Sequence, residues 1–249
     1  FPDPLFIRKG QGVTPTAYAT HLHQYISRGM EAFLSALDIT GSPHQQRVIT
    51  IATTPAMGAL LMPGLASALK PTFPQILLHN IAIVDAARQL DQRQVDLLID
   101  THLHSGQAIS HHVLYQDRVQ MYCRAGHPAL DGPQDETTLA EYEFALLLPE
   151  GQRYPTLHRR LQEEMGERRC GFSTFNLMTQ AAMIAGSDML GLTTERLFAM
   201  VSRLWPLQTL DFPSLGEEQI DVALHFNKLS GKEPLLKEII ETVIRSFKA

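Results

Sequence analysis

From Arg47 to the end of the chain, short apolar segments of strand length alternate with segments of helical periodicity, and this alternation restricts the fold most strongly. The first half contains predicted strands at 47–52, 75–80 and 95–100, and predicted helices at 56–69 and 84–92. The second half begins near His127, with predicted strands at 144–148, 170–174 and 188–192, and predicted helices near 153–165 and at 176–186. This order predicts two α/β halves, each with parallel strands joined by helical crossovers.

Further extended segments connect the two halves. Two extended stretches, 108–115 and 118–123, leave the first half, and a strand at 219–226 leads out of the second. The last helix, 234–247, has one apolar face, and the first half is its expected partner. We therefore expect subdomain I to comprise 47–123 plus 225–249 and subdomain II to comprise 124–224. Two antiparallel crossing strands would join these lobes and leave a cleft between them.

The residues before Arg47 have a different pattern. Residues 1–14 are typical of a hairpin with a turn at Gly10-Gln11-Gly12, and Thr14-Pro15 predicts an N-cap followed by proline in the first helical turn. The helix at 16–38 carries a stripe with alternating spacings of four and three, which predicts a dimerisation helix. The stripe consists of Tyr18, Leu22, Tyr25, Gly29 and either Ala32 or Phe33. The alternative is a helix packed on its own domain. Gly41-Ser42-Pro43 predicts a linker, so that 15–42 precedes a domain at 43–249.

Composition excludes several classes of protein. The chain of 249 residues is 44% hydrophobic and 19% charged, with a net charge of −5, which argues against disorder and against a broad nucleic-acid surface. No apolar run approaches the roughly 20 residues of a membrane span. Cys123 and Cys170 are the two cysteines, and their separation favours a reducing cytoplasm. The chain starts at Phe1 without a methionine, so we expect that a preceding segment was removed.

Motifs for catalysis or metal binding are absent from the sequence. It contains no nucleophile elbow, P-loop, dinucleotide fingerprint or zinc-protease motif, so we predict that the protein is not an enzyme. Eleven histidines suggest a metal site, but the closest pairs do not support one. His21 and His23 point to different faces of a helix, and adjacent residues of a strand, such as 111 and 112, face opposite ways. His102 and His104 could share a face, yet no second set of ligands completes a site. We predict no metal and no cofactor.

Hydroxyl and amide side chains recur where a strand gives way to a helix. Thr53-Thr54-Pro55 follows the first strand, where free amides and the helix dipole favour a carboxylate or another small anion. Plain N-capping by threonine is the alternative. Thr101, Phe175-Asn176 and Thr193 follow other strands. Because open α/β sheets bind ligands at the carboxyl ends of their strands, these residues predict a ligand cleft. Asp96 and Asp100 are expected to be structural or solvated.

Several segments together resemble one protein family. Residues 3–18, DPLFIRKGQGVTPTAY, are similar to the end of the winged helix-turn-helix and the start of the linker helix in LysR-type transcriptional regulators. The segments Leu61-Met62-Pro63, Phe73-Pro74 and VDLLID at 95–100 are similar to the first regulatory subdomain of that family. The crossover CRAGHPAL at 123–130 and the stretch AAMIAGSDMLGLTTERL at 181–197 extend the resemblance through the second subdomain. Within the family, the chain most resembles the LeuO-like branch.

The resemblance implies a fold and a function. The fold would be two Rossmann-like subdomains with a central cleft, similar to periplasmic binding proteins, preceded by a wing remnant at 1–14 and a linker helix at 15–42. The chain would sense a small effector and act as a homodimer or homotetramer, with DNA bound through the N-terminal domain of the full-length protein. Arg8 and Lys9 would lie on the wing that approaches the DNA backbone, although two charges on a turn are more often only solvated. The effector contacts would be Thr53, Thr54, Thr101, Asn176 and Thr193.

The chain also departs from the family pattern. The recognition helix would precede Phe1, so this segment is not expected to read DNA bases. Thr193-Thr194 replaces a Val-Pro or similar pair, and Gly186-Ser187-Asp188 replaces a more usual glycine-rich turn. These differences leave the effector open. A periplasmic-type solute-binding protein of the same fold is the alternative function, and it would not need a dimerisation helix. An enzyme with its active site in the cleft is a second alternative.

Overall fold

The computed structural model describes residues 4–9, 12–38, 47–147, 170–211 and 219–248. The chain divides into two compact units, Phe1–Gln46 and Arg47–Ala249. The predicted turn at 10–11, the linker at 41–43 and the predicted helix at 153–165 lie outside the described residues. None of the described helices is long and apolar enough to cross a membrane.

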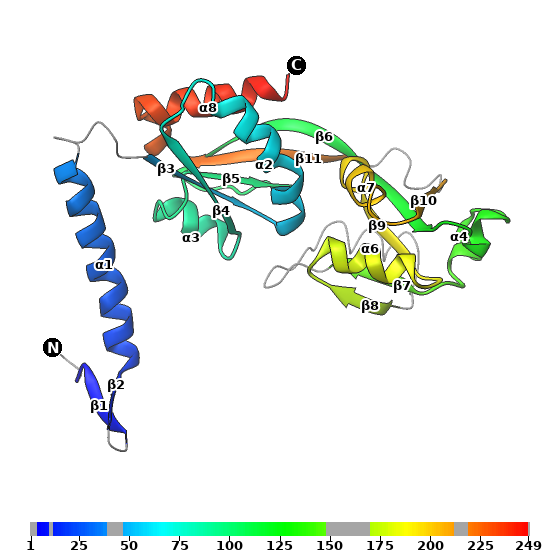
Figure 1. The fold of residues 1–249 in the computed structure, drawn as a ribbon, viewed down its shortest axis with the longest axis horizontal. Helices are drawn as coiled ribbons and strands as arrows, with labels where there is room; N and C mark the ends of the chain where they lie inside the picture. The colour runs from blue at the N-terminus through cyan, green and yellow to red at the C-terminus, as the bar shows by residue number, and fades with distance from the viewer. Residues whose placement is uncertain (1–3, 10–11, 39–46, 148–169, 212–218, 249) are drawn as a thin grey trace. The chain divides into compact units, whose positions relative to one another are not determined.

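The N-terminal unit consists of a hairpin followed by one long helix (Figure 1). The antiparallel strands are β1 (Phe6–Lys9) and β2 (Gly12–Pro15), and the helix is α1 (Ala17–Asp38). The predicted N-cap at Thr14 is wrong, because Pro15 still pairs with Phe6 in the hairpin. Thr16 takes this role instead, and its hydroxyl oxygen accepts a hydrogen bond from the Ala19 amide at 3.1 Å.

In the second unit, lobe one is a mixed sheet with helices on both faces (Figure 1). Strand order is β4, β3, β5, β11 and β6, with β3 parallel to β4 and β5, and β11 antiparallel to β5 and β6. These strands are β3 (Arg47–Thr53), β4 (Ile76–Ala82), β5 (Leu97–Asp100), β6 (Ile109–Arg124) and β11 (Gln219–Asn227). The parallel arrangement of the first three strands agrees with the pattern of the sequence.

Two separate hydrophobic clusters hold the helices of lobe one against its sheet. Helices α2 (Pro55–Leu69) and α8 (Pro234–Ser246) cover one face, where Ile49 and Ile51 are fully buried. Helix α3 (Ala86–Asp91) covers the opposite face. The predicted partner of the last helix is therefore confirmed: α8 packs on the first half and contacts α2.

Lobe two repeats the α/β arrangement. Strands β7, β8 and β9 are parallel to one another, and β9 pairs antiparallel with the second half of β6. The elements of this lobe are η1 (Pro128–Leu130), α4 (Glu136–Leu139), β7 (Phe144–Leu147), β8 (Cys170–Thr174), α6 (Leu177–Ala185), β9 (Leu190–Thr194), α7 (Glu195–Val201) and β10 (Leu207–Leu210). A further 3-10 turn, η3 (Ser230–Lys232), precedes α8 in lobe one.

The two lobes share two long strands. The sequence predicts separate stretches at 108–115 and 118–123, but the structure has a single strand, β6, over 109–124. Its first part pairs with β11 in lobe one, and its last part pairs with β9 and β10 in lobe two. The polar residues that interrupt the apolar pattern are hydrogen bonded, since Gln116 donates to Asp221 at 2.9 Å. The strand therefore continues across the junction, with a bulge at Val222/Ala223 in its partner.

Candidate functional site

The N-terminus of α2 is the first element of the candidate site. Thr54 is the N-cap, and its hydroxyl oxygen accepts a hydrogen bond from the Met57 amide at 3.4 Å. Thr53, the last residue of β3, is only 1% exposed, and its hydroxyl oxygen accepts a hydrogen bond from the Asn80 side-chain amide at 3.0 Å. Both hydroxyl oxygens thus act as acceptors within the protein, and these two bonds do not use the hydroxyl hydrogens.

Gly58 permits this arrangement. A Cβ atom at this position would lie 2.7 Å from the Asn80 Oδ1 atom and 2.8 Å from the Thr53 hydroxyl oxygen. Any larger residue would therefore displace the two polar side chains at the start of α2. Asn80 is held from β3 as well, because its Nδ2 atom also donates to the Ile51 carbonyl at 2.9 Å. Local sequence patterns do not indicate Asn80, because it lies on the neighbouring strand β4 and far from Thr53 in the chain.

Thr101 begins the loop after β5. It is half-buried, and its amide donates to Oδ1 of the fully buried Asp100 at 2.7 Å. The sequence predicts that Asp100 is either structural or solvated. Its complete burial excludes the solvated alternative. Asp96 is partly buried, and its Oδ2 atom accepts a hydrogen bond from the Thr50 amide at 2.8 Å. Burial raises the pKa of Asp96 above its ordinary value, against the opposing effect of that amide and of Arg47.

Lobe two contributes the N-terminus of α6 and the end of β9. Asn176 is the N-cap of α6, and its Oδ1 atom accepts hydrogen bonds from the Met178 amide at 2.8 Å and the Thr179 amide at 3.4 Å. The Phe175 ring beside it is 50% exposed. Thr193 is 8% exposed, and its hydroxyl oxygen has no hydrogen-bond partner. A buried hydroxyl without a partner carries a free-energy penalty that a bound polar group can remove.

The residues at the N-terminus of α2 and those at the N-terminus of α6 lie on helices that meet where the two lobes join. Helix α2 of lobe one contacts α6 and α7 of lobe two. Leu177, the first residue of α6, and Leu197 of α7 belong to the same buried cluster as Met57 and Leu61 of α2. The N-terminus of each helix is thus held by apolar packing, and the predicted ligand residues stand at the ends of packed elements.

A buried hydrogen-bond chain fixes α6 in lobe two. The hydroxyl of Tyr122 on β6 donates to Gln180 of α6 at 3.1 Å, and the Gln180 amide donates to the Ala145 carbonyl on β7 at 2.7 Å. Burial raises the pKa of Tyr122 above its ordinary value, so the hydroxyl stays neutral and can donate. This chain connects the helix that carries the Asn176 cap to the strand that both lobes share.

The turn after β6 is held by hydrogen bonds within lobe two. Arg124 donates from Nε to Asp188 at 2.8 Å, and the His127 Nδ1 atom accepts a hydrogen bond from the Ala129 amide at 3.0 Å. Between them, Gly126 has a φ of +67°, which a side chain would disfavour. These contacts hold the start of η1 against the loop before β9.

A histidine cluster lies on the face of the lobe-one sheet opposite α2. The His104 Nε2 atom is 2.8 Å from Asp100 Oδ2, and the His104 amide donates to His225 Nε2 at 3.1 Å. The rings of His102 and His104 are 4.8 Å apart, and those of His104 and His225 are 5.1 Å apart. The His111 ring lies 5.9 Å from that of His225. The pairing of β5, β11 and β6 brings these residues together. The spacing of the histidines along the sequence does not indicate that they form a cluster.

Burial controls the charge of the central histidine. His225 is fully buried, and its Nδ1 atom has no hydrogen-bond partner. Desolvation, together with repulsion from His104 and more weakly from His111, lowers the pKa of His225 to about 4. The attraction of Asp100 and the backbone of Leu98 oppose this shift. The described residues contain no group of three or more histidine, cysteine, aspartate or glutamate side chains arranged to hold a metal ion.

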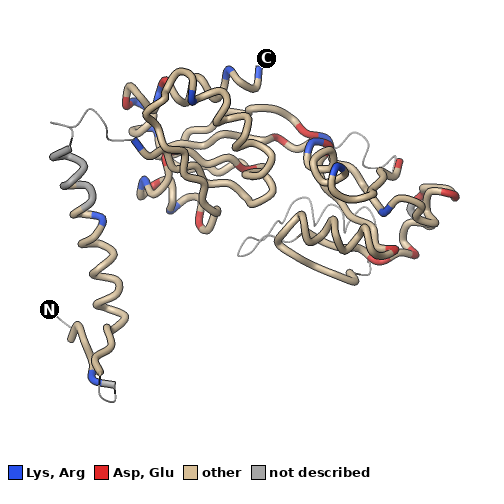
Figure 2. The backbone as a smooth tube through the Cα atoms, in the orientation of Figure 1, with Lys and Arg blue, Asp and Glu red and all other residues tan. Residues whose placement is uncertain are grey.

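Other candidate residues lie away from these elements. Arg8 is exposed on β1, and the side chain of Lys9 lies outside the described residues. A cavity of about 430 Å³ lies in lobe two beside β6 and β10, and none of the predicted effector residues lines it. Its lining includes Arg118, Gln120, Gln134, Thr209 and Asp211. Among the described residues of the second unit, Lys and Arg positions are spread along the backbone without forming one continuous stripe (Figure 2).

Comparison with known proteins settles the family. The family described as the LysR substrate binding domain matches residues 42–248. An uncharacterized HTH-type transcriptional regulator of Escherichia coli (strain K12), YbeF, is 49% identical over 247 residues, covering 99% of this chain and 78% of the relative. The chain belongs to the LysR family of transcriptional regulators. The predicted family is confirmed, while the LeuO-like branch stays a prediction.

Solved structures confirm the fold of this LysR-family chain. A probable transcriptional regulator from Pseudomonas aeruginosa, PA0477, matches with a TM-score of 0.76 at 19% identity, over 97% of this chain and 82% of that one. CrgA, a LysR-type regulator from Neisseria meningitidis, matches with a TM-score of 0.64 at 13% identity, over 100% of this chain and 85% of that one. The two-lobed α/β fold is therefore confirmed. The relatives are regulators and not enzymes, and they do not favour the solute-binding alternative.

Proposed function

We propose that this effector-binding region recognises a small anionic ligand between its two lobes. The site comprises Thr53, Thr54, Pro55, Thr101, Phe175, Asn176 and Thr193. The observation that carries the proposal is the hydrogen bonding at the start of α2, where Asn80 and the Met57 amide occupy the hydroxyl oxygens of Thr53 and Thr54. The free hydroxyl hydrogens and the helix dipole both favour an acceptor with negative charge, such as a carboxylate.

The partnerless hydroxyl of Thr193 supports the same site from lobe two. A ligand that contacts both lobes stabilises the arrangement in which both sets of contacts form. It can change the lobe geometry only by as much as its affinity differs between the two arrangements. The regulatory output then follows from linkage between ligand binding and DNA binding in the full-length protein.

The test compares benzoate with its uncharged isostere benzamide. We expect benzoate to raise the melting temperature of the wild-type chain and to bind in calorimetry, and benzamide to bind far more weakly. Thr54→Asp retains an N-capping side chain but places a negative charge at the site, so it should abolish benzoate binding. Thr209→Asp adds the same charge at the other cavity and is the matched control. If Thr209→Asp abolished benzoate binding and Thr54→Asp did not, the result would contradict the proposed site. It would place the ligand in the cavity beside β6 and β10.

The N-terminal unit supplies assembly and DNA contact in this proposal. The stripe on α1, made of Tyr18, Leu22, Tyr25, Gly29 and Phe33, pairs two subunits into a homodimer, from which a homotetramer could be built. Tyr18 and Leu22 are half-buried, while Tyr25 and Phe33 are exposed and free to meet a second helix. Arg8 and Lys9 on the wing at 1–14 approach the DNA backbone in the full-length protein. Because such a regulator meets its operator in the cytoplasm, we place the protein there.

A further inference from the structure

We propose that Asp100, His104, His111 and His225 form a proton-sensing site that controls the loop carrying Thr101. Protonation of His225 at the centre of this cluster would release the loop, and release would weaken ligand binding at the proposed site. The second statement rests on the proposed function, whereas the first can be tested without any ligand. A hydrogen bond from the His104 amide to the His225 ring connects this loop to β11.

The loop is held by the neutral form of His225. The amide of His104 donates to His225 Nε2, so that nitrogen must carry a lone pair. The neutral ring therefore has its proton on Nδ1. This bond joins residues that are 121 positions apart and fixes the fourth residue of the loop to the central part of the sheet. Asp100 holds the same loop at two further points, the Thr101 amide and the His104 ring.

Protonation of His225 would break this arrangement. The imidazolium has no lone pair at Nε2, so the His104 amide would lose its acceptor. The new charge would also lie against the rings of His104 and His111, with His102 packed on the far side of His104. Asp100 is the carboxylate that faces this ring, and its oxygens are already engaged by Thr101 and His104.

Nothing on the adjacent helix compensates for the charge. The buried residues of α3 that cover this face are Ala86, Gln89 and Leu90, none of which is ionisable. The Gln89 side chain is itself used, since it donates to the Ala82 carbonyl at 3.1 Å. A buried cation without a new partner is strongly unfavourable, so the cluster responds to acid by opening and not by accommodating the proton.

Linkage gives the expected size of the effect. His225 has a pKa of about 4 in the closed loop, and an exposed histidine has one of about 6.5. The open loop therefore binds a proton more readily than the closed loop between these values. Lowering the pH from 7 to 5 should favour opening by about 20-fold. The direction is the same for ligand binding, because Thr101 moves with the loop.

Hydrogen exchange of the amides at 101–104 provides the direct test. After correction for the intrinsic exchange rate, protection in the wild-type chain should fall by about 20-fold between pH 7 and pH 5. His225→Gln retains a side-chain acceptor for the His104 amide but cannot be protonated, so its protection should not depend on pH. His112→Gln changes the neighbouring residue that faces the other side of β6, and it should behave as the wild type.

Three results would overturn the proton-sensing site: equal protection of the wild type at both pH values, a pH dependence that persists in His225→Gln, or its loss in His112→Gln. If His225→Gln does not fold, NMR titration of the His225 ring in the wild type replaces it. The loop must then open over the pH range in which that ring is protonated, and opening without protonation refutes the proposal.

The link to the ligand site is tested separately with benzoate. Its affinity should fall from pH 7 to pH 5 in the wild type and stay constant in His225→Gln. Absence of benzoate binding at any pH would count against the proposed function but leave the hydrogen-exchange result standing. Binding that is equally strong at both pH values, in a chain whose loop opens in acid, would refute the connection between the loop and the ligand.

Discussion

Helices α1 and α8 are both amphipathic, yet their apolar faces have different surroundings. In α8, Ile239 and Val243 are fully buried against the lobe-one sheet and α2. In α1, the side chains of Tyr25, Ile26 and Phe33 are 54%, 56% and 60% exposed. An apolar stripe therefore predicts that a helix needs a partner, but it does not say whether that partner belongs to the same chain. For α1, we expect that partner to be a second subunit, as proposed above.

The largest expected effect comes from the packed helix. Ile239→Ala should lower the free energy of unfolding by about 2–5 kcal/mol, because the removed atoms lie in a closed core that cannot collapse fully. Urea denaturation followed by circular dichroism measures this loss. Met30→Ala, on the exposed surface of α1, is the control and should change the stability of the second unit by less than about 0.5 kcal/mol. Equal losses in both variants would remove the contrast between the helices.

The second prediction concerns association. Leu22→Glu with Tyr25→Glu places like charges on the stripe of α1, and we expect the dissociation constant of the dimer to rise by at least about 100-fold, which corresponds to about 2.7 kcal/mol. Sedimentation at several concentrations gives this constant. Thr20→Glu with Gln24→Glu adds the same charge off the stripe and should leave the mass unchanged. An undisturbed dimer in the first variant would show that α1 does not pair subunits.

The third prediction concerns the pH dependence of the stability of the second unit, which contains His225. The pKa of His225 is lowered to about 4 in the folded chain, so the unfolded chain binds the extra proton below pH 6.5. Stability should thus be full above pH 6.5 and fall as the pH decreases toward 4, by at most about 1.4 kcal/mol per pH unit. Chemical denaturation at pH 7, 6 and 5 measures the slope. An identical slope in His225→Gln would exclude this histidine as its source.

The fourth prediction tests the other part of the N-terminal unit. Arg8→Ala in the full-length protein should weaken DNA binding by about tenfold or less and reduce the slope of log affinity against log salt by about one. Titration of labelled operator DNA at several salt concentrations gives both quantities. Arg28→Ala, on α1, is the control and should keep the salt slope. An unchanged slope in Arg8→Ala would mean that Arg8 is only solvated.

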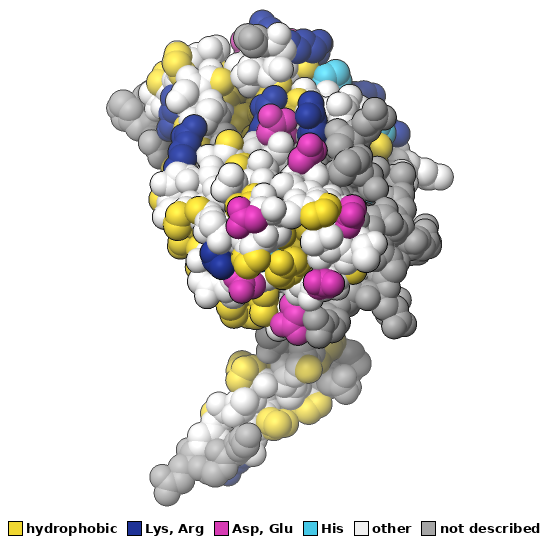
Figure 3. Space-filling model, turned by 90° about the vertical axis from the view of Figure 1, so that its right-hand side faces the viewer, with side chains coloured by type: hydrophobic (Ala, Val, Ile, Leu, Met, Phe, Trp, Pro, Cys, Tyr) yellow, Lys and Arg dark blue, Asp and Glu magenta, His cyan; other side chains and the backbone are white. Residues whose placement is uncertain are grey.

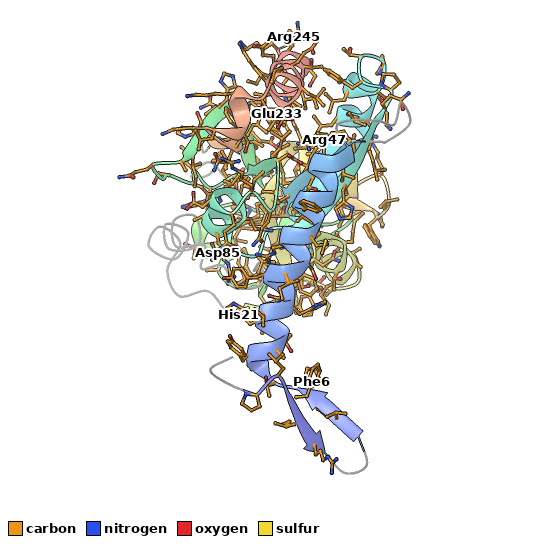
Figure 4. The ribbon with its side chains drawn as sticks, turned by 90° about the vertical axis from the view of Figure 1, so that its left-hand side faces the viewer. Phe6, His21, Arg47, Asp85, Glu233 and Arg245 are labelled. Atoms are coloured by element: carbon orange, nitrogen blue, oxygen red, sulfur yellow. The ribbon has the colours of Figure 1, made fainter. Side chains whose placement is uncertain are left out.

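The smallest effect is expected at the start of the second unit. The Arg47 Nη2 atom lies 3.5 Å from Glu233 Oε2, just before α8, and 3.7 Å from Asp96 Oδ1 (Figure 4). Because the Arg47 and Glu233 side chains are about half exposed, Arg47→Ala should lower stability by no more than about 1 kcal/mol. Thermal unfolding at low and high salt measures it, and salt should reduce the difference. A loss as large as that of Ile239→Ala would mean that α8 depends on this ion pair more than on its packing.

Periodicity in the sequence predicts most of the fold. The apolar runs at 47–52 and 144–148 correspond to β3 and β7, since buried parallel strands are nearly continuous in hydrophobicity. The missed elements are short: β10 has four residues and pairs only with β6, and α7 follows β9 without a break. For β6, the polar residues at 116–117 predict an interruption of the strand, but hydrogen bonds to residues distant in the sequence satisfy their side chains and the strand continues.

The candidate site was predictable only in its local parts. Thr54 and Asn176 are N-caps, and capping follows from the residue type and the adjoining periodicity. The contact between Asn80 and Thr53 depends on the register of β3 and β4, which no local pattern indicates. The histidine cluster likewise depends on strand pairing, because His225 meets His104 and His111 only through β11 and β6.

The outer surface of lobe two does not show a contrast like that between the exposed apolar face of α1 and the buried apolar face of α8. Acidic side chains are interspersed with hydrophobic ones over the face shown in Figure 3, without one large apolar area. Asp131, Asp135, Glu141 and Asp188 contribute to the charge of this lobe. Burial of its apolar residues instead occurs around Phe144 and Leu190 on one face of the sheet and around Tyr122 and Ile184 on the other.

The continuous strand β6 determines how this molecule can be divided. One end of it completes the sheet of lobe one and the other end completes the sheet of lobe two, with β11 alongside. A chain break near Gln116 would divide β6 and leave each sheet with only one half of this strand. Transplanting lobe two into another protein would likewise remove half of β6 from lobe one. The lobes are thus not interchangeable modules. Insertions and deletions that preserve the fold must therefore occur in loops, while β6 must keep its full length.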